Sequence, residues 1–259
     1  MDTRARNEPI SVYWQPGCTS CLRTKEFLTR HGVPFVSRNV LEDETAFTEL
    51  ARFGLKQVPV VTRGNEWVDG QVLQDVARIA GIALGGPNVL PVPELKKRLD
   101  AILAAAERFL GQLPAQELET HLPNRPRSYA DLAYHIFNIA DAFLEHEAGV
   151  PLIFDAYNRV PPPGMQNKIA LAAYGADVRR RLDAWFAGVG AARDWNATAN
   201  VYYGAQTMHQ FLERTTWHAG QHARQLMSVL ERLGIRPDRP LGPETFDGLP
   251  MPENVWDAD

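Results

Sequence analysis

A turn-rich stretch near residue 90 divides this chain of 259 residues into two parts with different hydrophobic periodicity. It contains Gly85-Gly86-Pro87-Asn88 and Pro91-Val92-Pro93, and neither run suits the interior of a helix. Short apolar runs alternate with helical segments before this stretch, whereas apolar residues recur at helical spacing after it. We therefore predict two domains that are joined by a linker at residues 85–93.

The part before the linker, residues 1–84, predicts a small α/β domain. We expect strands at residues 10–15, 33–36, 58–61 and 66–68, and helices at residues 18–31, 42–53 and 73–82. The order of these elements is βαβαββα, which implies a mixed sheet flanked by helices.

The part after the linker, residues 94–235, predicts an all-α domain. We expect its helices at residues 94–112, 129–147, 166–187 and 206–233. The second helix starts with Ser128-x-x-Asp131, which is typical of a helix N-terminus because the serine oxygen can cap a free backbone N–H group. Four helices with loops between them favour an up-and-down four-helix bundle. Residues 236–259 are rich in proline, and we expect an irregular C-terminal tail there.

Charge and composition restrict the function classes. The net charge is −4, and the lysines and arginines are scattered rather than clustered, so we expect no nucleic-acid partner. No apolar run follows the start of the chain as in a signal peptide, and none approaches the length that spans a bilayer. These features predict a cytoplasmic protein without a membrane partner.

Cys18-Thr19-Ser20-Cys21 lies where the first strand is expected to pass into the first helix. A cysteine at a helix N-terminus is stabilised as a thiolate, and a second cysteine one turn later can attack a mixed disulfide. Half of a zinc site is the alternative interpretation. It would need further ligands, and the chain has no other cysteine, so we favour a redox dithiol.

Three segments of the first domain together resemble the glutaredoxin family, especially its short NrdH-like members. They are Tyr13 to Cys21, Gln57-Val58-Pro59-Val60-Val61 and Trp67-Val68-Asp69-Gly70. The resemblance implies a thioredoxin fold with Cys18 as nucleophile and Cys21 as resolving thiol. It also implies a cis peptide between Val58 and Pro59, and a thiol-substrate site formed by Val58, Pro59, Asp69 and Gly70.

Three of the seven histidines form a candidate metal site. His218 and His222 are four residues apart and so share one face of a helix, where two imidazoles can bind one metal ion. His135 lies mid-helix among apolar residues and can supply a third ligand. His209 is expected on the opposite face, and His146 is three turns from His135. A solvated histidine pair and a hydrogen-bonded core histidine remain the alternative interpretation.

The segments Ser128 to His135 and Trp217 to Leu226 resemble the DinB-like superfamily. This resemblance implies a four-helix bundle whose second and fourth helices supply three histidine ligands, here His135, His218 and His222. It also implies one divalent metal ion, with zinc or nickel favoured over iron. Members include transferases and isomerases that use low-molecular-weight thiols such as glutathione. Gln221 and Gln225 can orient a substrate, or be ordinary polar residues of the bundle.

The leading functional hypothesis is an enzyme, a metal-dependent transferase or isomerase that uses a small thiol and an electrophilic substrate. The fused dithiol would supply, regenerate or remove that thiol. One alternative is a thiol–disulfide oxidoreductase whose bundle either forms a homodimer or docks a partner. Another is a non-catalytic protein of metal handling or stress response.

Overall fold

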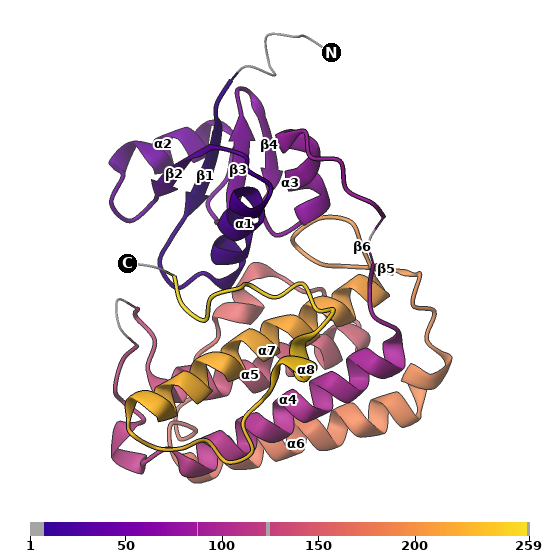
Figure 1. The fold of residues 1–259 in the computed structure, drawn as a ribbon. Helices are drawn as coiled ribbons and strands as arrows, with labels where there is room; N and C mark the ends of the chain where they lie inside the picture. Colours follow the sequence, from indigo (N-terminus) through magenta and orange to yellow (C-terminus); the bar gives the residue numbers. More distant parts are fainter. Residues whose placement is uncertain (1–7, 87, 123–124, 258–259) are drawn as a thin grey trace. The chain divides into compact units, whose positions relative to one another are not determined.

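The chain forms two compact units in the computed structural model, which describes residues 8–86, 88–122 and 125–257 (Figure 1). The first unit comprises Met1–Asn88 and Pro252–Asp259, and the second comprises Val89–Met251. The change from one unit to the other falls inside the predicted linker, whereas the predicted tail is divided between the units. In the part of the chain that the structure describes, no helix is long and apolar enough to cross a membrane.

The first unit has a four-stranded mixed sheet with the order β2-β1-β3-β4. Its strands are β1 (Ile10–Trp14), β2 (Phe35–Asn39), β3 (Val60–Arg63) and β4 (Glu66–Asp69), and its helices are α1 (Thr19–Arg30), α2 (Glu44–Arg52) and α3 (Leu73–Ala80). Strand β1 is parallel to β2 and antiparallel to β3, and β3 is antiparallel to β4. The predicted mixed sheet is thereby confirmed.

Both faces of this sheet are covered because β1 alternates its side chains between them. Ile10 and Val12 pack with residues of α1 and α3, such as Leu28 and Val76. Tyr13 points to the other face and belongs to a second apolar cluster with Leu50 of α2. The result is a layer of helices on each side, as expected for a thioredoxin-like domain.

The second unit is a four-helix bundle. Its helices are α4 (Val92–Gln112), α5 (Tyr129–Glu147), α6 (Lys168–Ala187) and α7 (Met208–Arg232). Helix α7 packs against α4 and α5, and α6 packs against the same two helices from the other side. The capping box predicted at the start of α5 is present, with Ser128 and Asp131 each bonded to the backbone N–H of the other.

Short elements in the loops of the bundle were not predicted. They are the 3-10 helices η2 (Ala115–Glu117), η3 (Phe154–Asn158) and η4 (Val189–Ala192), and the two-residue strands β5 (Thr198–Ala199) and β6 (Gln206–Thr207). These elements are too short to produce a periodic pattern. The proline-rich tail is not irregular throughout, since it contains helix α8 (Pro243–Phe246), where Pro243 occupies a first-turn position that suits proline.

Two helical glycines of the bundle should respond oppositely to alanine. A Cβ atom at Gly175 would lie 2.6 Å from the ring of Phe137, where α6 crosses α5. Gly175→Ala should therefore lower the free energy of unfolding by about 1–3 kcal/mol through overpacking. Gly111 in α4 has no atom within 4 Å of such a Cβ, so Gly111→Ala should raise it, by up to about 1 kcal/mol. Denaturant unfolding of both variants tests this, and equal effects would contradict it.

Candidate functional sites

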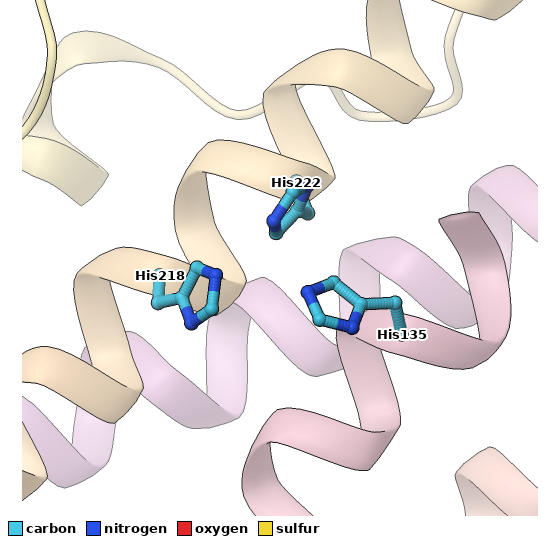
Figure 2. A group of neighbouring side chains, drawn as sticks. All are labelled: His135, His218 and His222. Atoms are coloured by element: carbon cyan, nitrogen blue, oxygen red, sulfur yellow. The ribbon is translucent and has the colours of Figure 1, made fainter. Parts of the chain in front are cut away.

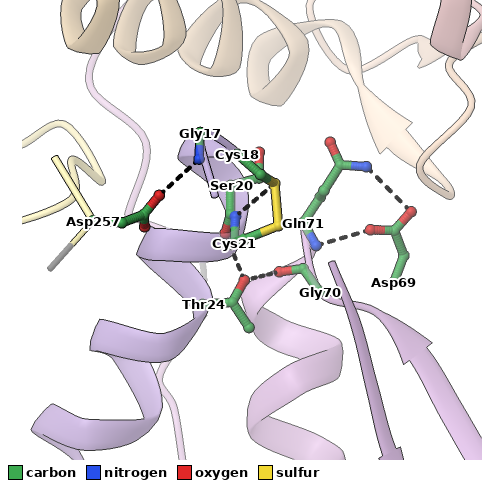
Figure 3. Close-up of a disulfide and its surroundings, with 9 residues drawn as sticks. All are labelled: Gly17, Cys18, Ser20, Cys21, Thr24, Asp69, Gly70, Gln71 and Asp257. Atoms are coloured by element: carbon green, nitrogen blue, oxygen red, sulfur yellow. Dashed lines mark hydrogen bonds between the residues drawn. A yellow bond between two sulfur atoms is a disulfide. The ribbon is translucent and has the colours of Figure 1, made fainter. Parts of the chain in front are cut away.

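The dithiol lies at the start of α1, as predicted. Cys18 is the N-cap residue of this helix, and its Sγ atom accepts a hydrogen bond from the backbone N–H of Cys21 at 3.1 Å. The two cysteines form a disulfide (Figure 3). Cys18 is half-buried whereas Cys21 is completely buried. A partner from solvent therefore reaches Cys18 first, which fits the assignment of Cys18 as the attacking thiol and Cys21 as the resolving one.

The predicted thiol-substrate site forms one connected structure. The peptide bond between Val58 and Pro59 is cis. Gly70 donates its backbone N–H to the carbonyl oxygen of Pro59 at 2.9 Å, and a Cβ atom at Gly70 would lie only 2.8 Å from that of Pro59. A side chain at position 70 therefore cannot fit without a shift of the Pro59 segment. Asp69 accepts a hydrogen bond from the backbone N–H of Gln71, which fixes the turn after β4.

Two buried residues of α1 hold this turn against the dithiol helix, and neither was singled out from the sequence. Thr24 donates its hydroxyl to the carbonyl oxygens of Ser20 and Gly70, at 2.8 and 2.6 Å (Figure 3). Arg23 donates to the carbonyl oxygen of Gln71 at 2.6 Å. Both lie in the turn of helix that follows Cys21, so their closeness in sequence to the two cysteines was the signal that could have identified them.

The three predicted histidines converge between two helices of the bundle. His135 lies on α5, and His218 and His222 lie on α7, with their rings facing one another (Figure 2). Their ring centroids are 4.6 to 5.3 Å apart, and one ligand nitrogen from each lies within 4.8 Å of the others. All three are buried, with at most 7% of each residue exposed. Three nitrogens so close together can bind a single ion.

The hydrogen bonds of the rings fit metal ligands. The Nδ1 atom of His222 lies 2.8 Å from Oε1 of Gln225, which can only accept, so Nδ1 carries the proton and Nε2 presents its lone pair. The Nδ1 atom of His135 is buried, and among the described residues it has no hydrogen-bond partner. A buried imidazole nitrogen without a partner costs free energy that a bound ligand or ion would offset.

Burial favours the neutral form of the His135 and His222 imidazoles, which is the form that binds metal. Desolvation, together with the nearby positive charge of Arg127, lowers the pKa of His222 to about 3. The same two causes, burial first, hold the pKa of His135 well below its usual range. No proton therefore competes with a metal ion at these two rings near neutral pH.

Two other histidines of the bundle serve elsewhere. The ring of His209 lies 2.7 Å from the carbonyl oxygen of Leu90, and this residue is not part of the three-histidine cluster. His146 accepts a hydrogen bond from the backbone N–H of Asn200 and also contacts Glu147. Their exclusion from the predicted metal site therefore agrees with their positions.

Sequence reasoning missed two side chains beside the cluster. Tyr157, in η3, lies edge-on to His218 with ring centroids 5.1 Å apart. Arg214, one turn before His218 on α7, is buried and lies near the rings of Tyr157 and Tyr203. The spacing between Arg214 and His218 was a usable signal, whereas Tyr157 lies in a loop without any periodic pattern.

The two glutamines of α7 are both buried. Gln221 accepts a hydrogen bond from Arg224 at 2.9 Å, and Gln225 contacts His222 as described above.

Gln225→Leu should weaken metal binding by about 10- to 100-fold, because the acceptor that orients His222 is lost. Gln225→Glu keeps an acceptor and should bind metal nearly as the wild type does. Competition with a metal chelator measures both, and equal affinity of the leucine variant would remove Gln225 from this role.

Comparison with known families and proteins agrees with this geometry. Residues 10–68 match the glutaredoxin family, and residues 98–226 match the DinB superfamily. Among curated relatives, the global transcriptional regulators Spx 2 and Spx of two Lactococcus lactis strains are 40% identical over 43 residues, 17% of this chain. The chain spans only a third of the length of those two relatives.

A more extended match is to the global transcriptional regulator Spx of Bacillus subtilis. It is 24% identical over 131 residues, which are 46% of this chain and 92% of the regulator. The chain thus contains a thiol redox module, and it joins a glutaredoxin domain to a domain of the DinB superfamily.

Proposed function

We propose that this protein is a metal-dependent transferase or isomerase that acts on a small electrophile with a low-molecular-weight thiol. We further propose that its dithiol supplies, regenerates or removes that thiol. The proposal is carried by the cluster of His135, His218 and His222, three buried ligands whose ligand nitrogens lie within 4.8 Å. Three protein ligands leave coordination positions open, which is typical of catalytic sites. Imidazole suits zinc, nickel and iron, and zinc or nickel is the expected ion because nitrogen ligands generally bind divalent iron more weakly.

The residues of the bundle would each have a defined task. The histidines would hold the ion, which supplies Lewis-acid chemistry and lowers the pKa of a thiol that binds it. Gln225 would keep the His222 ring in the tautomer that presents Nε2. Tyr157 and Arg214 lie on the His218 side of the cluster, where an aromatic ring and a positive charge can orient a substrate.

The dithiol would carry out thiol–disulfide exchange on the same class of small thiols. Cys18 is the accessible sulfur, and Gly70 is hydrogen-bonded to Pro59, which the family resemblance implies to lie beside the dithiol. Glutathione is the reference thiol for a first test. A homodimer through the bundle remains part of the proposal.

Elemental analysis and a conjugation screen test this function together. The purified protein is expected to contain about one divalent ion per chain and to accelerate the addition of a small thiol to electrophiles. Metal removal by a chelator should abolish conjugation, and re-addition should restore it. Conjugation that continues unchanged after metal removal would contradict the proposal and favour a plain thiol–disulfide oxidoreductase.

A second candidate is a redox-responsive regulator, and the similarity to the Spx regulators favours it. In that case the dithiol would change state without turnover. Repeated cycles of disulfide reduction, driven by an external reductant, would identify an enzyme. A single oxidation or reduction that alters the affinity for a macromolecular partner would identify a regulator.

A further inference from the structure

The C-terminal segment, residues 252–257, lies along α1, the helix that carries the dithiol. The carboxylate of Glu26 accepts the backbone N–H groups of Glu253 and Asn254 at 2.6 and 2.9 Å, and the side-chain amide of Asn254 at 2.7 Å. Arg30 pairs with the side chain of Glu253 at 3.3 Å. These bonds fix the segment to the second half of α1, from which it continues towards the start of that helix.

The segment ends its described course at the active-site loop. Asp257 accepts a hydrogen bond from the backbone N–H of Gly17 at 3.0 Å, across 240 residues of sequence (Figure 3). Gly17 directly precedes Cys18, so a carboxylate belonging to the chain itself is bonded one residue before the N-cap of the dithiol helix. A negative charge is stabilised at this end by the helix dipole and the free N–H groups.

Two basic side chains of α1 contact other parts of the first unit. The ammonium of Lys25 lies 3.3 Å from the ring centroid of Trp14. Burial lowers the pKa of Lys25, and the negative charges of Asp257 and Glu26 oppose that shift. Arg23 points to the carbonyl oxygen of Gln71, on the side of the Gly70 turn. Asp257 is thus an acidic side chain that is bonded to the loop before Cys18, and the ammonium of Lys25 lies close enough to interact with its charge.

We propose that Asp257, held in place by residues 252–257, is a specificity-determining residue of the dithiol that disfavours anionic disulfides and favours neutral or cationic ones. A carboxylate of an incoming partner would meet the fixed charge of Asp257 at the position where helix N-termini attract anions. An ammonium group would instead be attracted. The inference rests on the thiol–disulfide exchange proposed above and specifies its substrate class.

The exchange itself needs no further reagent in a single turnover. The Cys18 thiolate attacks one sulfur of a disulfide RSSR, which forms a Cys18–S–S–R bond and releases RS⁻. The Cys21 thiolate then attacks Cys18 Sγ, which closes the protein disulfide and releases the second RS⁻. The protein loses two electrons and the small disulfide gains them. The thiolates that are released take protons from solvent according to their pKa.

Charge-graded disulfides test the proposal. The full-length protein is reduced, freed of reductant and mixed with cystamine (cationic), hydroxyethyl disulfide (neutral) or oxidised glutathione (anionic). Protein oxidation is followed by tryptophan fluorescence or quenched alkylation. The rate ratio of cystamine to oxidised glutathione should fall by about fivefold or more in Asp257→Asn, because one negative charge at the loop that precedes Cys18 is removed. Any change in the thiolate fraction of Cys18 affects all rates equally and cancels in the ratio.

Glu253→Gln is the matched control, because it removes an exposed carboxylate of the same segment and keeps the three hydrogen bonds to Glu26 that hold the segment on α1. Its ratio should equal that of the wild type. Raising the salt concentration to 1 M should reduce the wild-type ratio and leave that of Asp257→Asn nearly unchanged, since salt screens the charge.

Two results would overturn the inference. One is a ratio that stays the same in Asp257→Asn and in a chain shortened to residue 251. The other is an equal rise of all three rates in both variants, which would indicate steric covering rather than charge. A wild-type protein that oxidises with none of the disulfides would instead refute the exchange activity itself, so the two failures are distinguishable.

Discussion

Replacement of His135, His218 or His222 by alanine is expected to remove most of the bound metal and, with it, the thiol-transfer activity. In the proposed site each residue would supply one of three ligands, and a two-ligand site would bind weakly. The loss of affinity should exceed the roughly 10- to 100-fold change that follows the loss of an outer-shell partner such as Gln225. Metal content per chain and the conjugation rate, measured in the same preparations, test this expectation.

His209→Ala is the matched control for these variants. His209 lies on the same helix, α7, but its ring contacts the carbonyl oxygen of Leu90 outside the cluster. This variant should keep full metal content. Full metal occupancy in His135→Ala would show that α5 supplies no ligand to the metal. Metal loss with unchanged conjugation would show that the ion is structural.

The second large effect is expected at the dithiol. In Cys18→Ser, the rate at which the protein reduces a disulfide substrate should fall to the uncatalysed level, because the accessible sulfur at the helix start is lost. Cys21→Ser should still attack a disulfide but should accumulate as a mixed disulfide, since the resolving thiol is absent. Each reduced variant is mixed once with hydroxyethyl disulfide, and mass spectrometry then detects the trapped adduct.

Alkylation of the reduced single-cysteine variants provides an independent check. Cys18, half-buried at the N-cap, should react at lower pH than Cys21, which is completely buried. A lower thiol pKa for Cys21 than for Cys18 would reverse the two roles. The wild-type protein, alkylated after reduction, gives the reference.

Local sequence signals predicted most elements of the fold. The start of α5 was set by Ser128 and Asp131, and both capping bonds are present. The sequence predicts strand β2 too early, at 33–36 instead of Phe35–Asn39, because the second half of the strand is polar. That half is held by tertiary ion pairs, since Arg38 binds Asp43 and Glu49, and such pairs leave no periodic trace. The last helix was started two residues early, at 206, where Gln206 and Thr207 form β6 instead.

The candidate sites were predictable to the extent that their residues lie close together in sequence. The spacing of His218 and His222 predicts one face of α7 for both, and the family resemblance supports His135 as the third ligand. Tyr157 lies beside them in η3, directly after Ala156, whose carbonyl oxygen accepts a hydrogen bond from the buried Asn138 of α5, and this contact between distant segments leaves no local pattern. The bond between Gly17 and Asp257 depends on contacts that no local pattern encodes.

The first unit is built from two separate segments of the chain, and this affects the order in which its parts are synthesised. The sheet and helices of this unit are encoded before residue 89, but residues 252–257 complete it. At about 5–20 residues per second, the ribosome needs roughly ten seconds or more to add the intervening bundle. The nascent dithiol domain is therefore expected to exist for that time without Asp257 at its active-site loop, and to react less selectively with cellular disulfides than the finished protein does.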